Sequence, residues 1–421
     1  MLGPRARRWL RRILITLASL AGVLAILAGG LVVSTWKVTG ARATGERLAR
    51  MQASPRWQDG RFNDTLPRQE PQIGKAALAY FTKRSKYREP DDTPPTLQRS
   101  ATEFEAPPRS GLRVTWLGHS TLLVEIDGQR VLVDPVWGER ASPFSWAGPR
   151  RFYAPPLPLA ELPPLDAVVI SHDHYDHLDM PTIEALAPTG VLFVVPLGVG
   201  AHLESWGVAP DRIVELDWWG EHRVGELRLV ATPARHFSGR SPLMLDKDQT
   251  LWAGWALLGP RHRVFFSGDS AMFPGFAEIG ARLGPFDLTM LESGAYNALW
   301  ADVHMGPEQA VAAHRMLRGD VLLPVHWGLF DLSFHGWTEP VERILAAAAP
   351  HGIRVATPQP GQSLEPAGPL PTARWWPELP WQTAEEAPVV SSGLGGLATL
   401  PARTRAADGS ALRAPLADQS R

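Results

Sequence analysis

The sequence contains no cysteine among its 421 residues. Disulfide bonds and thiolate metal ligands are therefore excluded, and the redox compartment of the protein is left open. A strong charge of either sign is also missing, because 42 basic and 43 acidic side chains give a formal net charge of −1. This balance gives no indication of a nucleic-acid partner, so none is expected.

One long apolar run stands near the N-terminus, an uncharged stretch from Ile13 to Trp36. It is long enough to cross a bilayer, and the preceding arginines favour a cytoplasmic N-terminus. We therefore expect residues 1–38 to form a basic segment and a single-pass anchor in a bacterial inner membrane, with the catalytic domain on the periplasmic side. A cleaved signal sequence and a twin-arginine export signal are the alternatives. The basic side chains are Arg5, Arg7, Arg8, Arg11 and Arg12.

Composition divides the rest of the chain into three parts. Residues 39–109 are polar with scattered prolines, which indicates a linker or a wrap over a folded domain at 110–365. Residues 366–421 are dominated by proline, alanine, glycine and serine, which predicts a largely disordered tail. The tryptophan-rich segment 375–381 is the exception, since it could dock on an apolar surface.

The segment from Ser171 to Asp179 contains the pattern H-x-H-x-D-H. A buried strand is expected before it, at 166–170, and a helix after it, with Asp179 as N-cap and Pro181 in the first turn. His172 and His174 can converge on one cation, and Asp176 and His177 on a second. Imidazole and carboxylate ligands suit zinc, and also iron or manganese.

Three further strand-like runs each end in a possible ligand, namely His236, Asp269 and His326. Together with the main pattern they predict a two-metal site. His172, His174 and His236 would hold one ion, Asp176, His177 and His326 the other, and the Asp269 carboxylate could bridge them. Asp134, at the end of another strand, is expected to brace a neighbouring ligand rather than to bind metal.

Two such ions lower the pKa of a shared water and yield a bridging hydroxide without a separate base. This chemistry hydrolyses a phosphoester, lactone, thioester or amide. His304 lies just before a helix opened by Pro307, near the positive end of that helix, where it could orient an anion or protonate a leaving oxygen. A histidine bonded to the backbone is the alternative interpretation of His304.

The order Asp134, H-x-H-x-D-H, His236, Asp269, His326 resembles the five motifs of the metallo-β-lactamase superfamily. The resemblance covers roughly residues 110–360 and implies an α/β fold, an αββα four-layer sandwich with the metals at one edge. Longer segments are similar to the N-acylphosphatidylethanolamine phospholipase D group. These segments include Asp134-Pro135-Val136, Glu215-Leu216-Asp217-Trp218-Trp219, Gly294-Ala295-Tyr296 and His326-Trp327-Gly328. By this resemblance His304 lies near the substrate phosphate and Tyr175 lines the pocket.

Some positions depart from the group. Asp173 stands where asparagine is frequent, Ser270 where threonine is usual, and Glu292-Ser293 where an apolar pair is common. The last change lies close to the expected pocket and bears on the identity of the substrate.

We therefore expect a two-zinc phosphodiesterase of the phospholipase D type that acts on N-acyl phosphatidylethanolamine-like phospholipids. A lactonase or sugar-phosphate hydrolase like the ascorbate-6-phosphate lactonase group is the second hypothesis, and a non-catalytic membrane scaffold is the third. Several tryptophans could line an acyl groove or pack in the core, namely Trp218, Trp219, Trp252, Trp255, Trp300 and Trp337. Headgroup, acyl chain, native metal and oligomeric state do not follow from the sequence.

Overall fold

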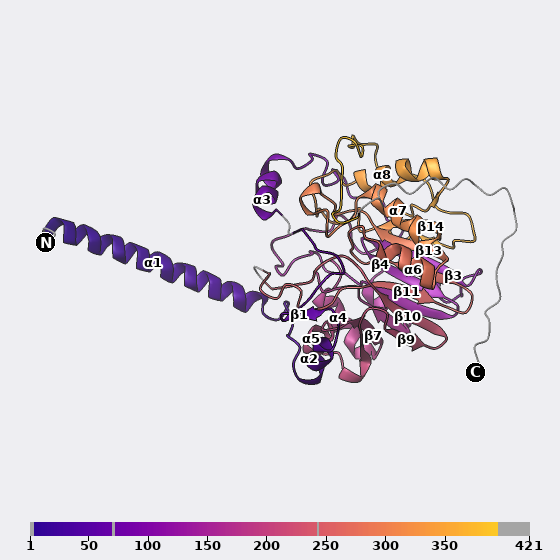
Figure 1. Ribbon diagram of the computed structural model, residues 1–421, viewed down its shortest axis with the longest axis horizontal. Helices are drawn as coiled ribbons and strands as arrows, with labels where there is room; N and C mark the ends of the chain where they lie inside the picture. The colour runs from indigo at the N-terminus through magenta and orange to yellow at the C-terminus, as the bar shows by residue number, and fades with distance from the viewer. Residues whose placement is uncertain (1–3, 70–71, 242–243, 395–421) are drawn as a thin grey trace.

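The computed structural model describes residues 4–69, 72–241 and 244–394. Two seven-stranded sheets form the centre of the domain (Figure 1). In order across the first sheet, the strands are β16 (Ser363–Leu364), β3 (Leu112–Gly118), β4 (Thr121–Ile126), β5 (Gln129–Val133), β6 (Ala167–Val169), β7 (Leu192–Pro196) and β8 (Ile213–Leu216). The strands of the second sheet are β15 (Arg354–Val355), β14 (Gly319–Val325), β13 (Phe286–Glu292), β12 (Arg263–Phe266), β11 (Gly254–Leu258), β10 (Leu227–Thr232) and β9 (Glu221–Val224).

Alternation along the strands assigns each apolar side chain to one of two faces. In β4, Leu122 and Val124 join the core between the sheets, whereas Leu123 joins the core on the outer face. This is the period of two expected for a strand that is buried on both sides. The Asp127-Gly128 hairpin between β4 and β5 is confirmed, and both residues have positive φ, at 48° and 89°.

Helices cover the outer face of each sheet. The outer core of the first sheet includes side chains from α4 (Met180–Leu186) and α5 (Gly200–Ser205). The outer core of the second includes side chains from α6 (Gly275–Leu283), α7 (Pro307–Leu317) and α8 (Glu339–Ala348). The expected αββα order of layers is therefore what the structure shows.

The polar segment before the domain contains α2 (Gly45–Gln52), the short strands β1 (Trp57–Gln58) and β2 (Arg61–Phe62), and α3 (Ile73–Thr82). It lies against the domain, since Arg47 pairs with Glu215 of β8 at 2.8 Å and Arg68 pairs with Asp248 at 2.7 Å. Before it, α1 (Pro4–Thr35) projects from the body as a single long helix (Figure 1). Its stretch Arg8–Ile26 has a mean hydropathy of 1.7 and no buried residue. By length and composition it could cross a membrane, and a signal sequence would meet the same criteria.

The segment after β16 differs from the expected disordered tail as far as residue 394. Trp376 is buried in the core between the sheets, and Trp375 stacks on Trp327 with ring centroids 5.3 Å apart. Aromatic rings contribute large apolar areas on burial, which explains why this segment is held against the domain. Residues 395–421, the rest of the expected tail, lie outside the described residues.

Candidate active site

The candidate ligands follow the carboxyl ends of strands that meet at one edge of the two sheets. β5 and β6 run parallel, and they lead to Asp134 and to the segment 171–177. β12, β13 and β14 also run parallel, and they lead to Asp269, Glu292 and His326. Carboxyl ends of parallel strands are where α/β proteins assemble their sites.

Three non-glycine residues at this edge have left-handed backbone conformations. They are His119, Asp134 and His326, with φ of 52°, 40° and 66°. Such conformations are disfavoured for residues other than glycine and cluster at functional sites. Here they turn the chain sharply where a strand ends, so that the side chain enters the site.

Asp134 is buried and lies behind the ligands, as expected. Its Oδ2 accepts hydrogen bonds from His177 Nδ1 at 2.7 Å and Ser171 Oγ at 2.5 Å, and its Oδ1 accepts from Ser171 N at 2.7 Å. A carboxylate in this position fixes the tautomer of the imidazole and leaves its Nε2 free to bind a metal.

The first ligand cluster consists of His172, His174, His236 and Asp269. His174 Nδ1 lies 2.8 Å from His172 Nε2 and 3.2 Å from His236 Nε2. The opposite nitrogens of two rings are held from outside, since His236 Nδ1 donates to Val303 O at 2.7 Å and His172 Nδ1 lies 2.9 Å from Ser171 Oγ. The predicted first metal set is thus brought together.

The second cluster consists of Asp176, His177, His326 and an additional histidine, His119. Asp176 Oδ2 lies 3.0 Å from His119 Nε2 and 3.2 Å from His326 Nε2. The sequence reasoning missed His119, which follows β3 in the turn that leads to β4. Its signal was a single histidine after Gly118 at a strand end, a weaker pattern than H-x-H-x-D-H.

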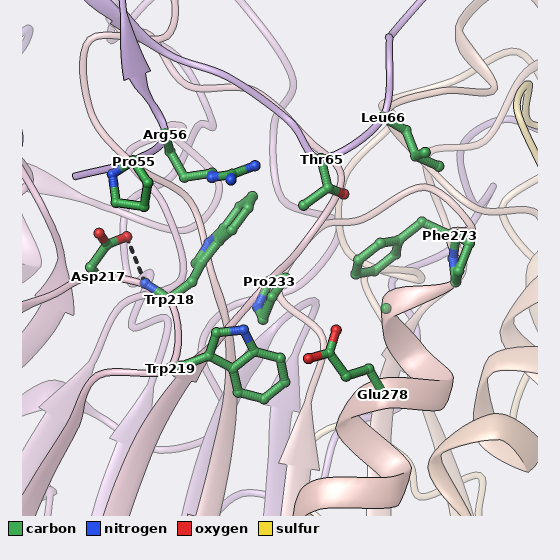
Figure 2. Close-up of a pocket in the computed structure, with 12 residues that line it drawn as sticks. Pro55, Arg56, Thr65, Leu66, Asp217, Trp218, Trp219, Pro233, Phe273 and Glu278 are labelled. Carbon is green, nitrogen blue, oxygen red and sulfur yellow. Dashed lines mark hydrogen bonds between the residues drawn. The ribbon is translucent and has the colours of Figure 1, made fainter.

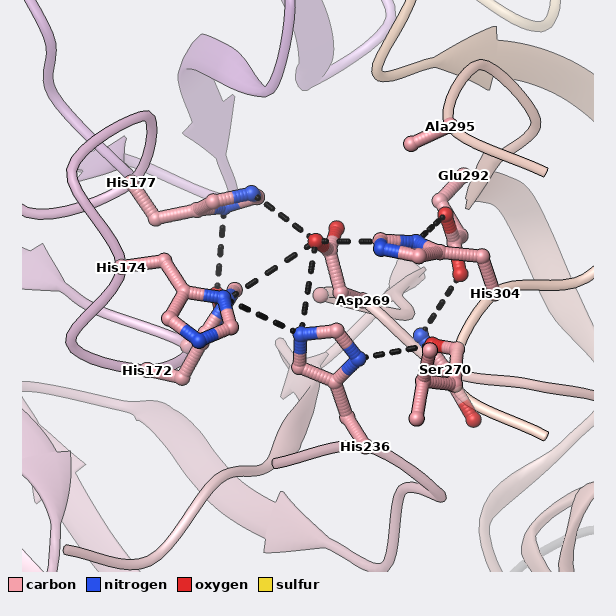
Figure 3. Close-up of polar contacts among 12 residues, drawn as sticks. His172, His174, His177, His236, Asp269, Ser270, Glu292, Ala295 and His304 are labelled. Atoms are coloured by element: carbon pink, nitrogen blue, oxygen red, sulfur yellow. Dashed lines mark hydrogen bonds and ion pairs between the residues drawn. The ribbon is translucent and has the colours of Figure 1, made fainter. Parts of the chain in front are cut away.

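Asp269 lies between the two clusters (Figure 3). Its Oδ2 is 3.0 Å from His326 Nε2 and 3.3 Å from His177 Nε2 on one side. On the other side the same oxygen is 3.8 Å from His172 Nε2 and 3.7 Å from His236 Nε2. This position agrees with the predicted bridging carboxylate.

Glu292 connects His304 to the site, a contact that the sequence reasoning did not foresee. Its Oε2 accepts from His304 Nδ1 at 2.9 Å, and its Oε1 accepts from the backbone N–H groups of Ser270 at 2.8 Å and Met305 at 3.3 Å. Because an ionised carboxylate can only accept, this bond places the ring proton on Nδ1 and leaves Nε2 for another partner. The rings of His304 and His236 lie 4.9 Å apart between centroids (Figure 3).

Several buried polar atoms in the clusters make no hydrogen bond with the described residues. They are His119 Nδ1, His177 Nε2, both ring nitrogens of His326, and Asp269 Oδ1. Buried polar atoms almost always have a partner, and an ion is one explanation for those that do not. Two groups of imidazole and carboxylate donors that share one aspartate, with unpaired atoms facing inward, fit a pair of metal ions.

Burial and neighbouring charge control the protonation of the ligands. Burial lowers the pKa of His172 and His236 well below the ordinary value, so both are neutral, the form that coordinates a metal. In the second cluster burial acts in the same direction on His326, but Asp269 and Asp176 together outweigh it and raise the pKa of His326 to about 10. Burial opposes ionisation of Asp269, yet His177 and His326 hold the pKa of its carboxyl well below the usual range.

Tyr175 does not lie where the resemblance implied. Its hydroxyl donates to Arg240 O at 2.6 Å, and it is absent from the residues that line the cavity at the clusters. The Arg240 guanidinium lies 4.1 Å from the centroid of the Tyr175 ring. The expectation that Tyr175 contacts the substrate is therefore not supported by its position.

Arg240 is buried and holds the metal-binding loop from behind. Its Nη1 donates to Leu178 O at 2.8 Å and to Asp173 O, and its Nη2 donates to Val38 O at 3.0 Å. We call Arg240 and these three carbonyls the Arg240 node. The node joins the chain that leaves α1 to the loop that contains the H-x-H-x-D-H pattern.

A cavity of about 280 Å³ opens onto both clusters. Trp300 contributes to its wall, whereas Trp252 and Trp255 are fully buried core residues. The cavity is lined by His174, Asp176, Phe237, Asp269, Ala295, Trp300, Val303, His304, His326 and Leu332.

A second cavity, of about 490 Å³, lies between Trp218, Trp219 and Phe273 (Figure 2). The Arg282 guanidinium stacks on Trp219 at 3.8 Å from the ring centroid. Among the described residues, the groups able to hold a metal lie elsewhere, at the two clusters and around Glu292. This cavity is therefore separate from the candidate active site.

Comparison with known proteins places this site in a family. The profile of the Beta-lactamase superfamily domain matches residues 129–327. An uncharacterised protein of Mycobacterium tuberculosis is 56% identical over 275 residues, which are 63% of this chain and 72% of that protein. The N-acyl-phosphatidylethanolamine-hydrolyzing phospholipase D 1 of Caenorhabditis elegans is 37% identical over 255 residues, which are 58% of this chain and 70% of that protein. Among solved structures, an isothiocyanate hydrolase from Delia radicum gut bacteria is 22% identical, with a TM-score of 0.48 over 60% of this chain and 98% of that one.

The two ligand clusters and the parallel strand ends that position them agree with the matching domain profile and with the sequence relatives. The chain belongs to the metallo-β-lactamase superfamily and is a metal-dependent hydrolase related to the N-acyl-phosphatidylethanolamine-hydrolysing phospholipases D.

Proposed function

We propose that the protein is a two-zinc phosphodiesterase of the phospholipase D type, which hydrolyses N-acyl phosphatidylethanolamine-like phospholipids. The observation that carries the proposal is His304, which shares the cavity with both clusters and is fixed through its Nδ1 by Glu292. The name of the Caenorhabditis elegans relative gives further support, because it specifies this lipid substrate.

The chain supplies three functions around the scissile phosphodiester. The two clusters would hold the metals, which supply an activated water and positive charge for the phosphate oxygens. Asp134 and Val303 O fix the rings of His177 and His236, so that the ligand nitrogens are already oriented. With Nδ1–H donating to the Glu292 carboxylate, which stabilises an imidazolium, the His304 ring can also carry a proton on Nε2. From there it can donate a hydrogen bond to a phosphate oxygen or pass that proton to the leaving alcohol oxygen. A lactone hydrolase has less use for this additional group.

A substrate panel tests the proposal. The zinc-loaded full chain, in detergent, is offered N-acyl phosphatidylethanolamine, phosphatidylethanolamine and lactones, and the products are identified by mass spectrometry. We expect phosphatidic acid and an N-acylethanolamine from the first lipid, with Asp269→Asn as the inactive control. Efficient lactone opening with no phospholipid cleavage would move the assignment to the lactonase group, and no turnover of any kind would favour the scaffold.

We further propose that α1 anchors the protein in the inner membrane of a bacterium, with the catalytic domain on the periplasmic side. The basic side chains before the apolar stretch support this orientation. Alkaline phosphatase and green fluorescent protein, fused in turn to the C-terminus, test it. We expect an active phosphatase and a dark fluorescent protein, and the opposite pair of results would invert the topology.

A further inference from the structure

The helix α3 exposes large apolar side chains to solvent. Phe81 is 84% exposed and Leu78 is 66% exposed, and Tyr80 stands beside Phe81 with ring centroids 5.2 Å apart. We call these three residues the α3 apolar face. Exposed Lys75 and Lys83 lie at the two ends of the face. An apolar face bordered by lysines is typical of helices that lie in a membrane interface.

The α3 apolar face is at the end of the domain from which α1 projects (Figure 1). A bilayer crossed by α1 would therefore meet the domain at this end. Leu245, 69% exposed, follows Arg240 in the chain, and Arg240 bonds Val38 just beyond α1. The exit of α1 thus has a second exposed apolar side chain close to it.

The walls of the active-site cavity are continuous along the chain with segments that lie next to the α3 apolar face and to Leu245. Ala295 and Trp300 form part of its wall, and the intervening residues 296–299 line a neighbouring groove together with Leu78 and Ala79 of α3. Gln72 N, at the start of α3, donates to Leu299 O at 3.3 Å, which ties the helix to this wall. On the other side of the cavity, Phe237 leads along the chain to Arg240 and Leu245.

We propose that the α3 apolar face is a second membrane contact, which inserts into the interface of the bilayer crossed by α1. The mouth of the metal cavity is then held against the lipid surface between α3 and the exit of α1. A phospholipid can reach the metals along the groove beside α3 without leaving the bilayer. This inference rests on the proposed membrane-anchored lipid hydrolase.

A bilayer fits the α3 apolar face better than a protein partner does. Lys75 and Lys83 match the negative charge of anionic headgroups, which attract basic residues beside a membrane. The location of α3 at the end of the domain from which α1 projects brings the helix to the membrane surface, because the proposed anchor belongs to the same chain (Figure 1).

The absence of cysteine permits a direct test, since one introduced thiol is unique in the chain. Phe81→Cys in the full chain is labelled with a polarity-sensitive fluorophore and reconstituted in nanodiscs that contain anionic phospholipid. Leu20→Cys in α1 is the control for lipid, and Glu226→Cys, in the turn between β9 and β10, is the control for water. We expect the Phe81 label to emit like the Leu20 label.

The outcomes separate this inference from the proposed function. If the Phe81 label emits like the Glu226 label while the Leu20 label reports lipid, the membrane contact of α3 is refuted and the anchor stands. If the Leu20 label also reports water, the anchor fails and the inference fails with it.

A second measurement links the contact to catalysis. The double variant Tyr80→Gln/Phe81→Gln changes only exposed side chains of α3 that do not line the groove, so the fold and the path to the metals are preserved. Its turnover of phospholipid embedded in nanodiscs should fall on the order of tenfold, as expected for the loss of two apolar contacts with the bilayer. Its turnover of a short-chain soluble phosphodiester should be unchanged. Equal rates for variant and wild type on both substrates would overturn the proposed role.

Discussion

The metal cavity and the Arg240 node lie on two sides of the same loop, and they differ in how their buried polar atoms are satisfied. At the node, the side-chain nitrogens of Arg240 all donate to backbone carbonyls. In the cavity, His177 Nε2, His326 Nε2 and Asp269 Oδ1 make no hydrogen bond with the described residues. Since an unsatisfied buried polar atom is costly, the difference identifies the region that a ligand completes. The chain completes the node itself, whereas the donor atoms of the cavity fit metal ions that would complete it.

Of the changes that test this comparison, removal of the metals should have the largest effect on activity and stability. A chelator should lower activity on the order of 10³-fold or more, because the activated water is lost, and should lower the melting temperature, because bound ions stabilise only the folded state. Elemental analysis, activity and thermal unfolding are measured before and after zinc is returned. Full activity in a preparation with no bound metal would contradict the two-metal site.

The next largest loss of activity is expected for Asp269→Asn, with Asp134→Asn as the matched control. Asp269 touches both clusters, whereas Asp134 only positions His177, so we expect losses in kcat/KM on the order of 10³-fold and 10-fold, respectively. Metal content should fall further in the Asp269 variant. A larger loss in the Asp134 variant would show that the bridging position is wrongly assigned.

His304→Gln should lower kcat on a phosphodiester about 10²-fold, as expected for the loss of a positioned proton donor, and leave the metal content intact. Glu292→Gln is the milder companion, with a loss of about 10-fold. The amide oxygen can still accept from Ser270 N and Met305 N, while the bond from His304 Nδ1 is lost. Metal loss in the His304 variant would instead make His304 a ligand.

Arg240→Met should affect stability more than chemistry. It leaves the carbonyls of Val38, Asp173 and Leu178 without their donor, and we expect a fall of about 3 kcal/mol in the free energy of unfolding. Denaturant unfolding of the metal-loaded protein measures it, with the exposed Arg223→Met as control. Equal stability of the two variants would show that the node contributes little.

The smallest effect is expected at Asp64. Its buried carboxyl is only partly compensated by Arg68, so it stands between the satisfied Arg240 node and the unsatisfied metal cavity. Burial raises its pKa to about 7, although Arg68, which it shares with Asp248, acts in the opposite direction. The folded protein therefore holds this proton more tightly than the unfolded chain, and stability is lost as pH rises from about 4 to 7. Asp64→Asn should remove this loss, so the variant should gain on the order of 1 kcal/mol relative to wild type between pH 5 and pH 8. An identical pH dependence in wild type and variant would contradict the raised pKa.

Local patterns predicted most of the fold and the main ligands. The contiguous H-x-H-x-D-H pattern after a buried strand, and the single ligands after later strands, are short-range patterns that can be recognised in the sequence alone. His119 and Glu292 were missed as functional residues because each is a single residue whose role depends on strands far away in the sequence. Glu292 was noticed only as a departure, although its contact with His304 joins the end of β13 to the residues before α7.

Tyr175 and the last described segment show that position in the sequence does not determine where a side chain lies in the fold. Tyr175 is next to two ligands in sequence, but its ring follows Arg240, which comes from a different loop. The composition of residues 366–394 predicted disorder, with the tryptophan-rich segment 375–381 as an exception that could dock on an apolar surface. Trp375 and Trp376 do contact Trp327 and Trp337. The sequence thus indicated the docking segment, but it could not show which residues of the domain receive it.

The Arg240 node also sets a limit on how the protein can be shortened for study in water. Two side-chain nitrogens of Arg240 bind the carbonyl of Val38, which lies only a few residues beyond α1. A chain that begins at residue 40 would lose this acceptor and leave a buried guanidinium partly unpaired beside the H-x-H-x-D-H loop. A chain that begins at Trp36 would keep it. The boundary between the N-terminal helix and the hydrolase domain is therefore best drawn before Val38, within the stretch 1–38 that the sequence predicts to be an anchor.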